Sequence, residues 1–134
     1  MERIACILIG YVFGLFQTGY LYGRMQHVDI RKMGSGNAGS TNALRTLGIK
    51  AGICTFLGDS FKCIFAVLAV RLILEAHMKR SCRFLSIYAG MGAVLGHNFP
   101  FYLKFKGGKG IAAMAGLLAA LTNLWITLIA LVVF

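Results

Sequence analysis

Two glycine-rich segments contain the residues of this sequence whose types and spacing could do chemistry. The first runs Gly34-Ser35-Gly36-Asn37-Ala38-Gly39-Ser40-Thr41-Asn42, and the second runs Phe105-Lys106-Gly107-Gly108-Lys109-Gly110. Glycine leaves backbone N–H groups unshielded, and hydroxyl and amide side chains add further donors, so segments of this kind can bind phosphate oxygens. Two of them in one short chain predict chemistry on phosphorylated substrates.

The first glycine loop, residues 34–42, is uncharged but lies between the basic residues Arg31 and Arg45. A short helix over residues 43–47, capped by polar side chains of the loop and stopped by Gly48, would direct its partly positive N-terminus at the loop. We expect Arg45 to act as a catalytic cation here. The expected phosphate ligands are Ser35, Gly36, Asn37, Gly39, Thr41 and Asn42. The same composition also fits a flexible turn between helices.

The second glycine loop, residues 105–110, places Lys109 among glycines directly before an uncharged apolar run. Because Gly110 follows Lys109 in place of serine or threonine, this is not a Walker A loop. We expect Lys109 and His97 to be catalytic residues. The binding residues expected around them are Asn98, Lys106, Gly107 and Gly108. A membrane boundary that meets anionic lipid would also explain the lysines, but it would not explain the glycines.

Composition indicates a membrane protein. The 134-residue chain is 58% hydrophobic and has one proline, whereas soluble domains are roughly 45–50% apolar. Residues 4–22 and 110–134 carry no charge and have the length of a membrane-spanning helix, and residues 52–74 and 84–103 form two further apolar runs. We therefore predict an all-α, polytopic integral membrane protein with about four transmembrane helices. All of residues 1–134 would form one membrane-embedded domain.

Charged residues and a proline interrupt the two middle runs. Asp59 and Lys62 are three positions apart, so they can neutralise each other on one helical face. They could form a structural ion pair, or they could line a polar site at membrane depth. Pro100 is expected to end or kink the helix of residues 84–103.

The net charge of +10 comes from 14 Lys and Arg against 4 Asp and Glu. In a soluble protein this would suggest a nucleic-acid partner, but here the aromatic residues lie in apolar runs of membrane-spanning length, and we expect no such partner. With four helices, more basic residues fall on the side of the two glycine loops than on the opposite side. The positive-inside rule then predicts that both loops face the cytoplasm.

The two loops also carry a family resemblance. The patterns Gly34-Ser35-Gly36-Asn37-x-Gly39-x-Thr41-Asn42-x-x-Arg45 and Gly96-His97-x-Phe99-Pro100-x-x-x-x-Phe105-Lys106-Gly107-Gly108-Lys109-Gly110 resemble the first two signature motifs of the bacterial acyl-phosphate:glycerol-3-phosphate acyltransferases, the PlsY family. Leu57-Gly58-Asp59-x-x-Lys62, between them, is similar to that family as well. Two departures stand out: Phe16-Gln17-Thr18 replaces the usual Ser-Ile-Pro, and the family's third motif is absent. We therefore expect a chain without the C-terminal third of a typical member.

The resemblance implies a multi-pass enzyme of the bacterial inner membrane. It would transfer an acyl group from acyl phosphate to the 1-hydroxyl of sn-glycerol 3-phosphate and give lysophosphatidic acid for phospholipid biosynthesis, with no metal or other cofactor. By the same resemblance, the Ser35 loop and Arg45 would hold one phosphate, and Lys109 with Lys106 would hold the second phosphate or the charge on the acyl carbonyl. His97 and Asn98 would orient glycerol hydroxyls, and an apolar groove would take the acyl chain among the membrane lipids.

Other functions remain compatible with the residues. A small transporter for an organic phosphate would also use basic glycine loops, but it would need polar residues at membrane depth on several helices, where mainly Asp59 and Lys62 qualify. A non-catalytic membrane adaptor would tolerate substitution of the glycines. An inactive fragment of the acyltransferase is the third alternative, because four helices enclose only part of a groove.

Overall fold

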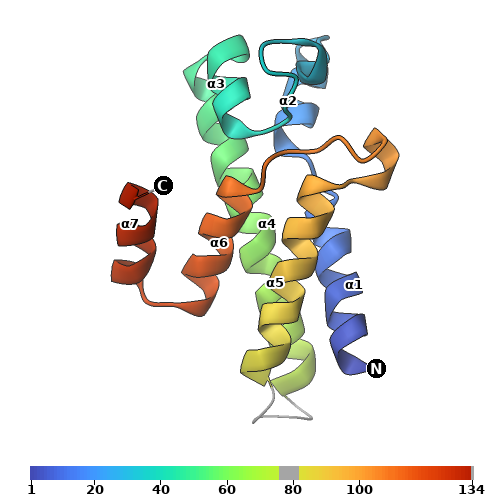
Figure 1. Cartoon of the computed structure of the whole chain (residues 1–134), viewed down its shortest axis with the longest axis vertical. Coiled ribbons are helices and arrows are strands. Elements are labelled where there is room, and N and C mark those ends of the chain that lie inside the picture. The colour runs from blue at the N-terminus through green and yellow to red at the C-terminus, as the bar shows by residue number, and fades with distance from the viewer. Residues whose placement is uncertain (76–81, 134) are drawn as a thin grey trace.

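The structure is a computed structural model that describes residues 1–75 and 82–133. Within these ranges every regular element is a helix, which confirms the predicted all-α fold (Figure 1). In chain order the elements are α1 (Glu2–Gly14), α2 (Thr18–Met25), the 3-10 helix η1 (Ile30–Lys32), α3 (Ser40–Leu47), α4 (Ile49–Glu75), α5 (Cys82–Asn98), the 3-10 helix η2 (Phe101–Leu103), α6 (Ile111–Leu121) and α7 (Leu124–Val133).

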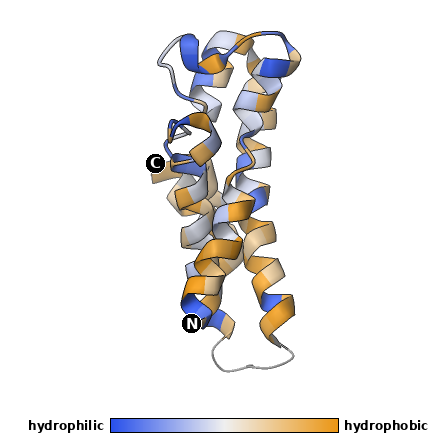
Figure 2. Cartoon of the chain, turned by 90° about the vertical axis from the view of Figure 1, so that its right-hand side faces the viewer, coloured by the Kyte–Doolittle hydropathy of each residue, from blue (hydrophilic) through white to orange (hydrophobic). Residues whose placement is uncertain are grey.

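Small residues allow α1, α4, α5 and α6 to pack closely. A methyl group added to Gly10 would meet the carbonyl group of Ala89, and one added to Gly116 would meet that of Ser60. Glycine at such contacts is usual between helices in membranes, where backbones approach each other directly. Figure 2 shows hydrophobic residues concentrated in the lower halves of the long helices and hydrophilic residues around the loops at the upper end.

The first apolar run is not the single helix predicted for residues 4–22. Helix α1 ends at Gly14 and α2 begins at Thr18, with Gln17 in a non-helical conformation between them. The buried Gln17 amide donates to the carbonyl oxygens of Gly14, Gly96 and His97 at 3.3, 3.4 and 2.9 Å. These acceptors lie at the ends of α1 and α5, so one side chain satisfies backbone groups that the two helix ends leave unpaired.

The last apolar run also differs from the prediction. We expected one transmembrane helix over residues 110–134, but α6 ends at Leu121 and the chain turns back into α7 (Figure 1). Thr122 is extended, and Asn123 Oδ1 accepts a hydrogen bond from the backbone N–H of Ile126 at 3.0 Å, which caps α7. At 1.5 Å per residue, α6 extends for roughly half of a hydrocarbon core.

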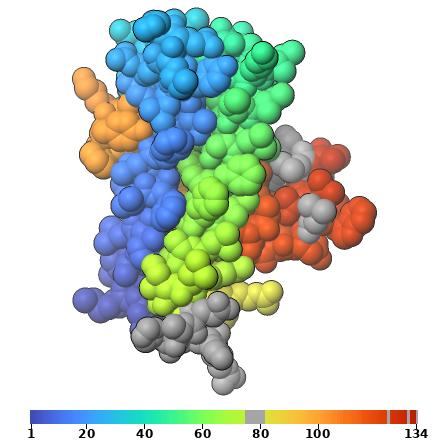
Figure 3. Space-filling view, turned by 180° about the vertical axis from the view of Figure 1, so that it is seen from behind, coloured from blue at the N-terminus to red at the C-terminus, as the bar shows by residue number. Residues whose placement is uncertain are grey.

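Arg71 stabilises the end of α6 at Leu121. Its guanidinium group donates to the carbonyl oxygen of Ala120 at 3.1 Å and to Ser86 Oγ at 3.3 Å. A cation near the last carbonyl groups of a helix opposes the negative end of its dipole. In Figure 3 the α6–α7 pair lies beside α4, on the opposite side from α1.

The count of four transmembrane helices is therefore only partly supported. Among the described residues, two helical stretches are long and apolar enough to cross a membrane, Glu2–Met25 and Ile49–Leu74. Helix α5 is shorter than the run of residues 84–103 because it ends before Pro100, as predicted. Both glycine loops lie at the end of the bundle that carries α2 and α3, so they share one side (Figure 1).

Candidate active site

A cavity of about 210 Å³ lies between the two glycine loops. Its wall includes the first glycine loop, the first turn of α3, one residue each from α4 and α5, and the junction of the second glycine loop with α6. The lining residues are Ser35, Asn37, Gly39, Ser40, Thr41, Asn42, Arg45, Asp59, His97, Lys109, Gly110, Ile111 and Ala112. Segments far apart in the sequence thus form one polar site.

Asn42 holds the first glycine loop in shape. Its amide nitrogen donates to the carbonyl oxygens of Ile30, Met33 and Asn37 at 3.2, 3.0 and 2.8 Å, and its Oδ1 accepts from the backbone N–H of Ser35 at 3.0 Å. The residue is almost fully buried. Because these bonds occupy its amide, Asn42 shapes the loop, although we had predicted it as a phosphate ligand.

The rest of this loop presents polar groups to the cavity. Asn37 Oδ1 accepts from the backbone N–H of Gly39 at 2.8 Å and closes a tight turn. Helix α3 then starts at Ser40, earlier than predicted, and its N-terminal cap is Gly39, which offers no side-chain acceptor. Gly39 therefore does not cap the first backbone N–H groups of α3. Ser40 and Thr41, in this first turn, line the cavity.

The position of Arg31 just before the first glycine loop suggested that it would supply positive charge to the cavity. In the structure its charge is already paired. Its guanidinium group forms an ion pair with Asp29 at 2.7 Å, lies over the ring of Tyr20 and donates to the carbonyl oxygen of Leu103 at 3.4 Å. The hydrogen bonds from Arg31 lower the pKa of Asp29, and the same pairing raises the pKa of Arg31. Arg31 thus links the segment before the first loop to η2, just before the second.

The second glycine loop folds back onto the end of α5. The backbone N–H groups of Gly107 and Gly108 donate to the carbonyl oxygens of Asn98 and His97 at 3.2 and 3.1 Å. A methyl group on Gly107 would lie 2.9 Å from the oxygen of Asn98, and one on Gly108 would collide with the imidazole of His97. Glycine is needed at both positions for this packing, whereas the sequence had suggested close approach of phosphate.

The structure brings most of the predicted site residues together. Eight of them line the cavity: Ser35, Asn37, Gly39, Thr41, Asn42, Arg45, His97 and Lys109. Five do not line it: Gly36, Asn98, Lys106, Gly107 and Gly108. The side chain of Asn98 lies instead against Gly110, where a methyl group would be 2.7 Å from its Oδ1.

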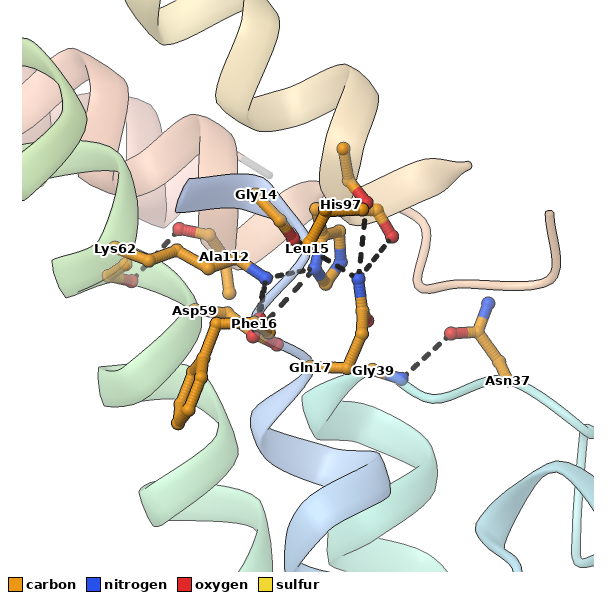
Figure 4. A network of polar contacts seen from close by, with 12 residues as sticks. Gly14, Leu15, Phe16, Gln17, Asn37, Gly39, Asp59, Lys62, His97 and Ala112 are labelled. Carbon is orange, nitrogen blue, oxygen red and sulfur yellow. Dashed lines mark hydrogen bonds and ion pairs between the residues drawn. The ribbon is translucent and has the colours of Figure 1, made fainter. Parts of the chain in front are cut away.

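The sequence left the role of Asp59 and Lys62 open and did not predict a role for Gln17. Asp59 and Lys62 form a buried ion pair at 3.0 Å (Figure 4). Asp59 also lines the cavity, whereas Lys62 does not. Gln17 was not singled out as a site residue, although a glutamine inside an uncharged apolar run was a usable signal. It holds the end of α5 next to the cavity.

Comparison with known proteins identifies the family. The family model described as glycerol-3-phosphate acyltransferase matches residues 4–134. The chain belongs to this family. It is 45% identical over 118 residues to a glycerol-3-phosphate acyltransferase of Alkaliphilus metalliredigens, and this match covers 87% of this chain and 56% of that protein. It is 44% identical over 136 residues to a glycerol-3-phosphate acyltransferase of Clostridioides difficile, and this match covers 98% of this chain and 64% of that protein.

Solved structures agree with this assignment. The crystal structure of PlsY (YgiH), an integral membrane glycerol 3-phosphate acyltransferase, in its glycerol 3-phosphate form superposes with a TM-score of 0.82 at 29% identity, over 98% of this chain and 63% of that one. Its lysophosphatidic acid form gives a TM-score of 0.79. This member of the glycerol-3-phosphate acyltransferase family is thus a membrane protein, and it spans less than two thirds of the relatives it matches.

The packing of the second loop leads to a first prediction. Gly107→Ala is expected to lower the free energy of unfolding by about 1–3 kcal/mol more than Gly39→Ala, because the added methyl group would collide with backbone at the end of α5. At Gly39 the nearest atom, Asn37 Oδ1, is 3.0 Å away and belongs to a side chain. Both variants would be compared by thermal unfolding of the purified protein. An equal loss of stability in the two variants would contradict the packing explanation.

Proposed function

We propose that this chain forms the phosphate-binding part of an enzyme that transfers an acyl group from acyl phosphate to the 1-hydroxyl of sn-glycerol 3-phosphate. The products are lysophosphatidic acid and inorganic phosphate. The observation that carries this proposal is that Arg45 and Lys109, from the two glycine loop regions, line one cavity together with the first turn of α3. Backbone N–H groups and two cations suit a reaction between two phosphorylated substrates.

Each side of the cavity has a role in this reaction. The first glycine loop, the N-terminus of α3 and Arg45 bind one phosphate. Lys109, at the start of α6, binds the second phosphate or the charge that develops on the acyl carbonyl oxygen. The two cations offset the repulsion between the substrates, and holding the reacting atoms together supplies much of the rate enhancement.

The reaction needs no covalent intermediate on the protein. The 1-hydroxyl oxygen attacks the acyl carbon, the bond from that carbon to the phosphate oxygen breaks, and the departing phosphate takes the hydroxyl proton. The acyl phosphate is already activated, so the protein has to position the two substrates and stabilise charge. Neither role requires a metal or other cofactor.

An apolar groove of about 270 Å³ between α6 and α7 suits the acyl chain. It shares Lys109, Gly110 and Ile111 with the polar cavity and continues past Met114, Ala115, Leu118 and Ala130. A chain in this groove would have its carbonyl end near Lys109. The arrangement places the apolar and the anionic parts of one lipid-like substrate in adjoining spaces.

A substitution in the groove should change the acyl-chain preference. Ala115→Leu fills part of the groove and is expected to lower the rate with long-chain acyl phosphates several-fold relative to short-chain ones. Ala119→Leu, on an exposed position of the same helix, is the matched control. The measurement is kcat/KM over a series of acyl phosphates. A uniform loss over all chain lengths would contradict a role of this groove in chain binding.

We further propose that the protein lies in the bacterial inner membrane with both glycine loops facing the cytoplasm. The shared position of the loops at one end of the bundle and the excess of basic residues there support this orientation. A cysteine introduced at the exposed Lys106 should react with a membrane-impermeant thiol reagent in inverted vesicles and not in intact cells, in a background without the native cysteines. The reverse labelling would overturn the orientation.

The activity is tested by phosphate release that depends on glycerol 3-phosphate. The chain would be assayed as it stands, and also fused to the region of the Clostridioides difficile relative that follows the matched residues. The fusion is expected to consume palmitoyl phosphate and to produce lysophosphatidic acid at the rate of phosphate release. Hydrolysis of acyl phosphate without acylation of glycerol 3-phosphate would overturn the proposed function.

A further inference from the structure

Lys62 lies in the interior of the bundle beside three acceptors. Its Nζ is 2.6 Å from the carbonyl oxygen of Phe16, 3.0 Å from Asp59 Oδ1 and 2.8 Å from Nδ1 of His97 (Figure 4). The Lys62 and Asp59 side chains are 4% and 1% exposed. Because this site is almost dry, each of these contacts must be an energetically satisfied hydrogen bond.

The three protons of the Lys62 ammonium group determine the protonation state of the His97 ring. An ammonium group has three protons, and the three neighbours of Lys62 Nζ can each accept one. The carboxylate of Asp59 balances the ammonium charge, so a neutral His97 leaves the cluster with no net charge. A protonated ring would place an N–H against the ammonium group and add an uncompensated charge. His97 is therefore neutral, and its Nδ1 is the acceptor.

The proton of the ring must then be on Nε2, at the other edge of the imidazole. This edge lies next to Gly108, because a methyl group there would meet Nε2 first. The backbone of His97 is fixed as well, since its carbonyl oxygen accepts from Gln17 Nε2 at 2.9 Å and from the N–H of Gly108 at 3.1 Å. The residue lines the cavity that Arg45 and Lys109 also line.

We propose that Lys62 is a positioning residue that keeps His97 in the Nε2–H tautomer, so that His97 donates a hydrogen bond to a ligand oxygen and does not act as a base. The nature of that oxygen, on a phosphate or an acyl carbonyl, rests on the proposed function. The tautomer itself does not. Asp59 acts through Lys62 by holding its charge, and Gln17 acts through the backbone of His97.

The tautomer can be measured without any activity. The full chain would be labelled with ¹⁵N-histidine in lipid nanodiscs, and His97→Gln would identify the signals of this residue among the three histidines. The expected result is a protonated Nε2 and an unprotonated Nδ1. The paired variant Asp59→Asn with Lys62→Met should give a mixture of tautomers. A protonated Nδ1 in the unsubstituted chain would overturn the proposal, whatever the variants do.

Kinetics test the role of the donor separately. Glutamine can place an amide N–H near the position of Nε2, whereas asparagine reaches only the position of Nδ1. In the active fusion, His97→Gln is expected to retain at least about tenfold more kcat/KM than His97→Asn. A higher activity of His97→Asn would overturn the donor role. If the fusion showed no transfer at all, the proposed function would fail while the measured tautomer still decided the role of Lys62.

Discussion

Lys109→Ala is expected to lower kcat/KM for acyl transfer by about 10²–10³-fold without unfolding the protein. Lys109 lines the polar cavity and also begins the apolar groove, so its charge is next to the point where an acyl carbonyl would lie. Its side chain is exposed and makes no packing contribution that alanine would remove from the core. Lys109→Arg keeps the charge and should retain part of the activity.

The matched control is Lys104, which lies in the same basic segment but does not line the cavity. Its backbone is left-handed, with φ of 55°, so asparagine is the appropriate neutral replacement. Lys104→Asn should leave kcat/KM within about twofold of the parent, since an exposed charge outside the site is largely screened. A loss as large as that of Lys109→Ala would indicate a diffuse lipid-binding surface in place of a specific site.

The sequence was sufficient to predict that the two glycine loops lie close together. Local features carried that information: glycines, flanking cations and the start of a helix next to each loop. The structure places Lys109 and Arg45 on one cavity, as expected. What the spacing could not distinguish was the reason for each glycine. Gly107 and Gly108 pack against the end of α5, and only the fold brings that end close to them.

The two helix breaks illustrate a different limit. Residues 4–22 and 110–134 are uncharged and long enough to span, so hydropathy alone predicts continuous helices. The break at Gln17 is stabilised by carbonyl groups of α5, and the end of α6 is stabilised by Arg71 from α4. These partners are distant in sequence. A polar residue in an apolar run marks such a position, but its partner becomes known only from the fold.

The buried cluster was predicted in part for the same reason. The spacing of Asp59 and Lys62 indicated that they could form an ion pair, because residues three apart share a helical face, and the structure shows that pair. His97 and the carbonyl group of Phe16 come from other elements and complete the set of acceptors. Local periodicity could therefore indicate that Lys62 was paired, but not that it also determines which nitrogen of a histidine carries the proton.

Asn37→Asp is expected to raise KM for a phosphorylated substrate at least about tenfold while the protein folds normally. Asn37 lines the cavity, and its Oδ1 accepts from the N–H of Gly39. Aspartate keeps an oxygen at that position, so the turn is preserved. It also adds a negative charge, and like charges about 4 Å apart near a protein surface repel by roughly 4 kcal/mol. KM would be measured for glycerol 3-phosphate and for acyl phosphate separately.

Asn37→Ala separates the charge from the shape of the loop. It removes the hydrogen bond to Gly39 without adding charge, and a loss of one such bond is worth about 1 kcal/mol. If the cavity binds anions, the aspartate variant should be clearly worse than the alanine variant, and the difference should shrink as salt is added. The substrate whose KM rises more is the one bound by the first loop. An aspartate variant as active as the parent would mean that no phosphate approaches Asn37, and the first loop would then be only a structural turn.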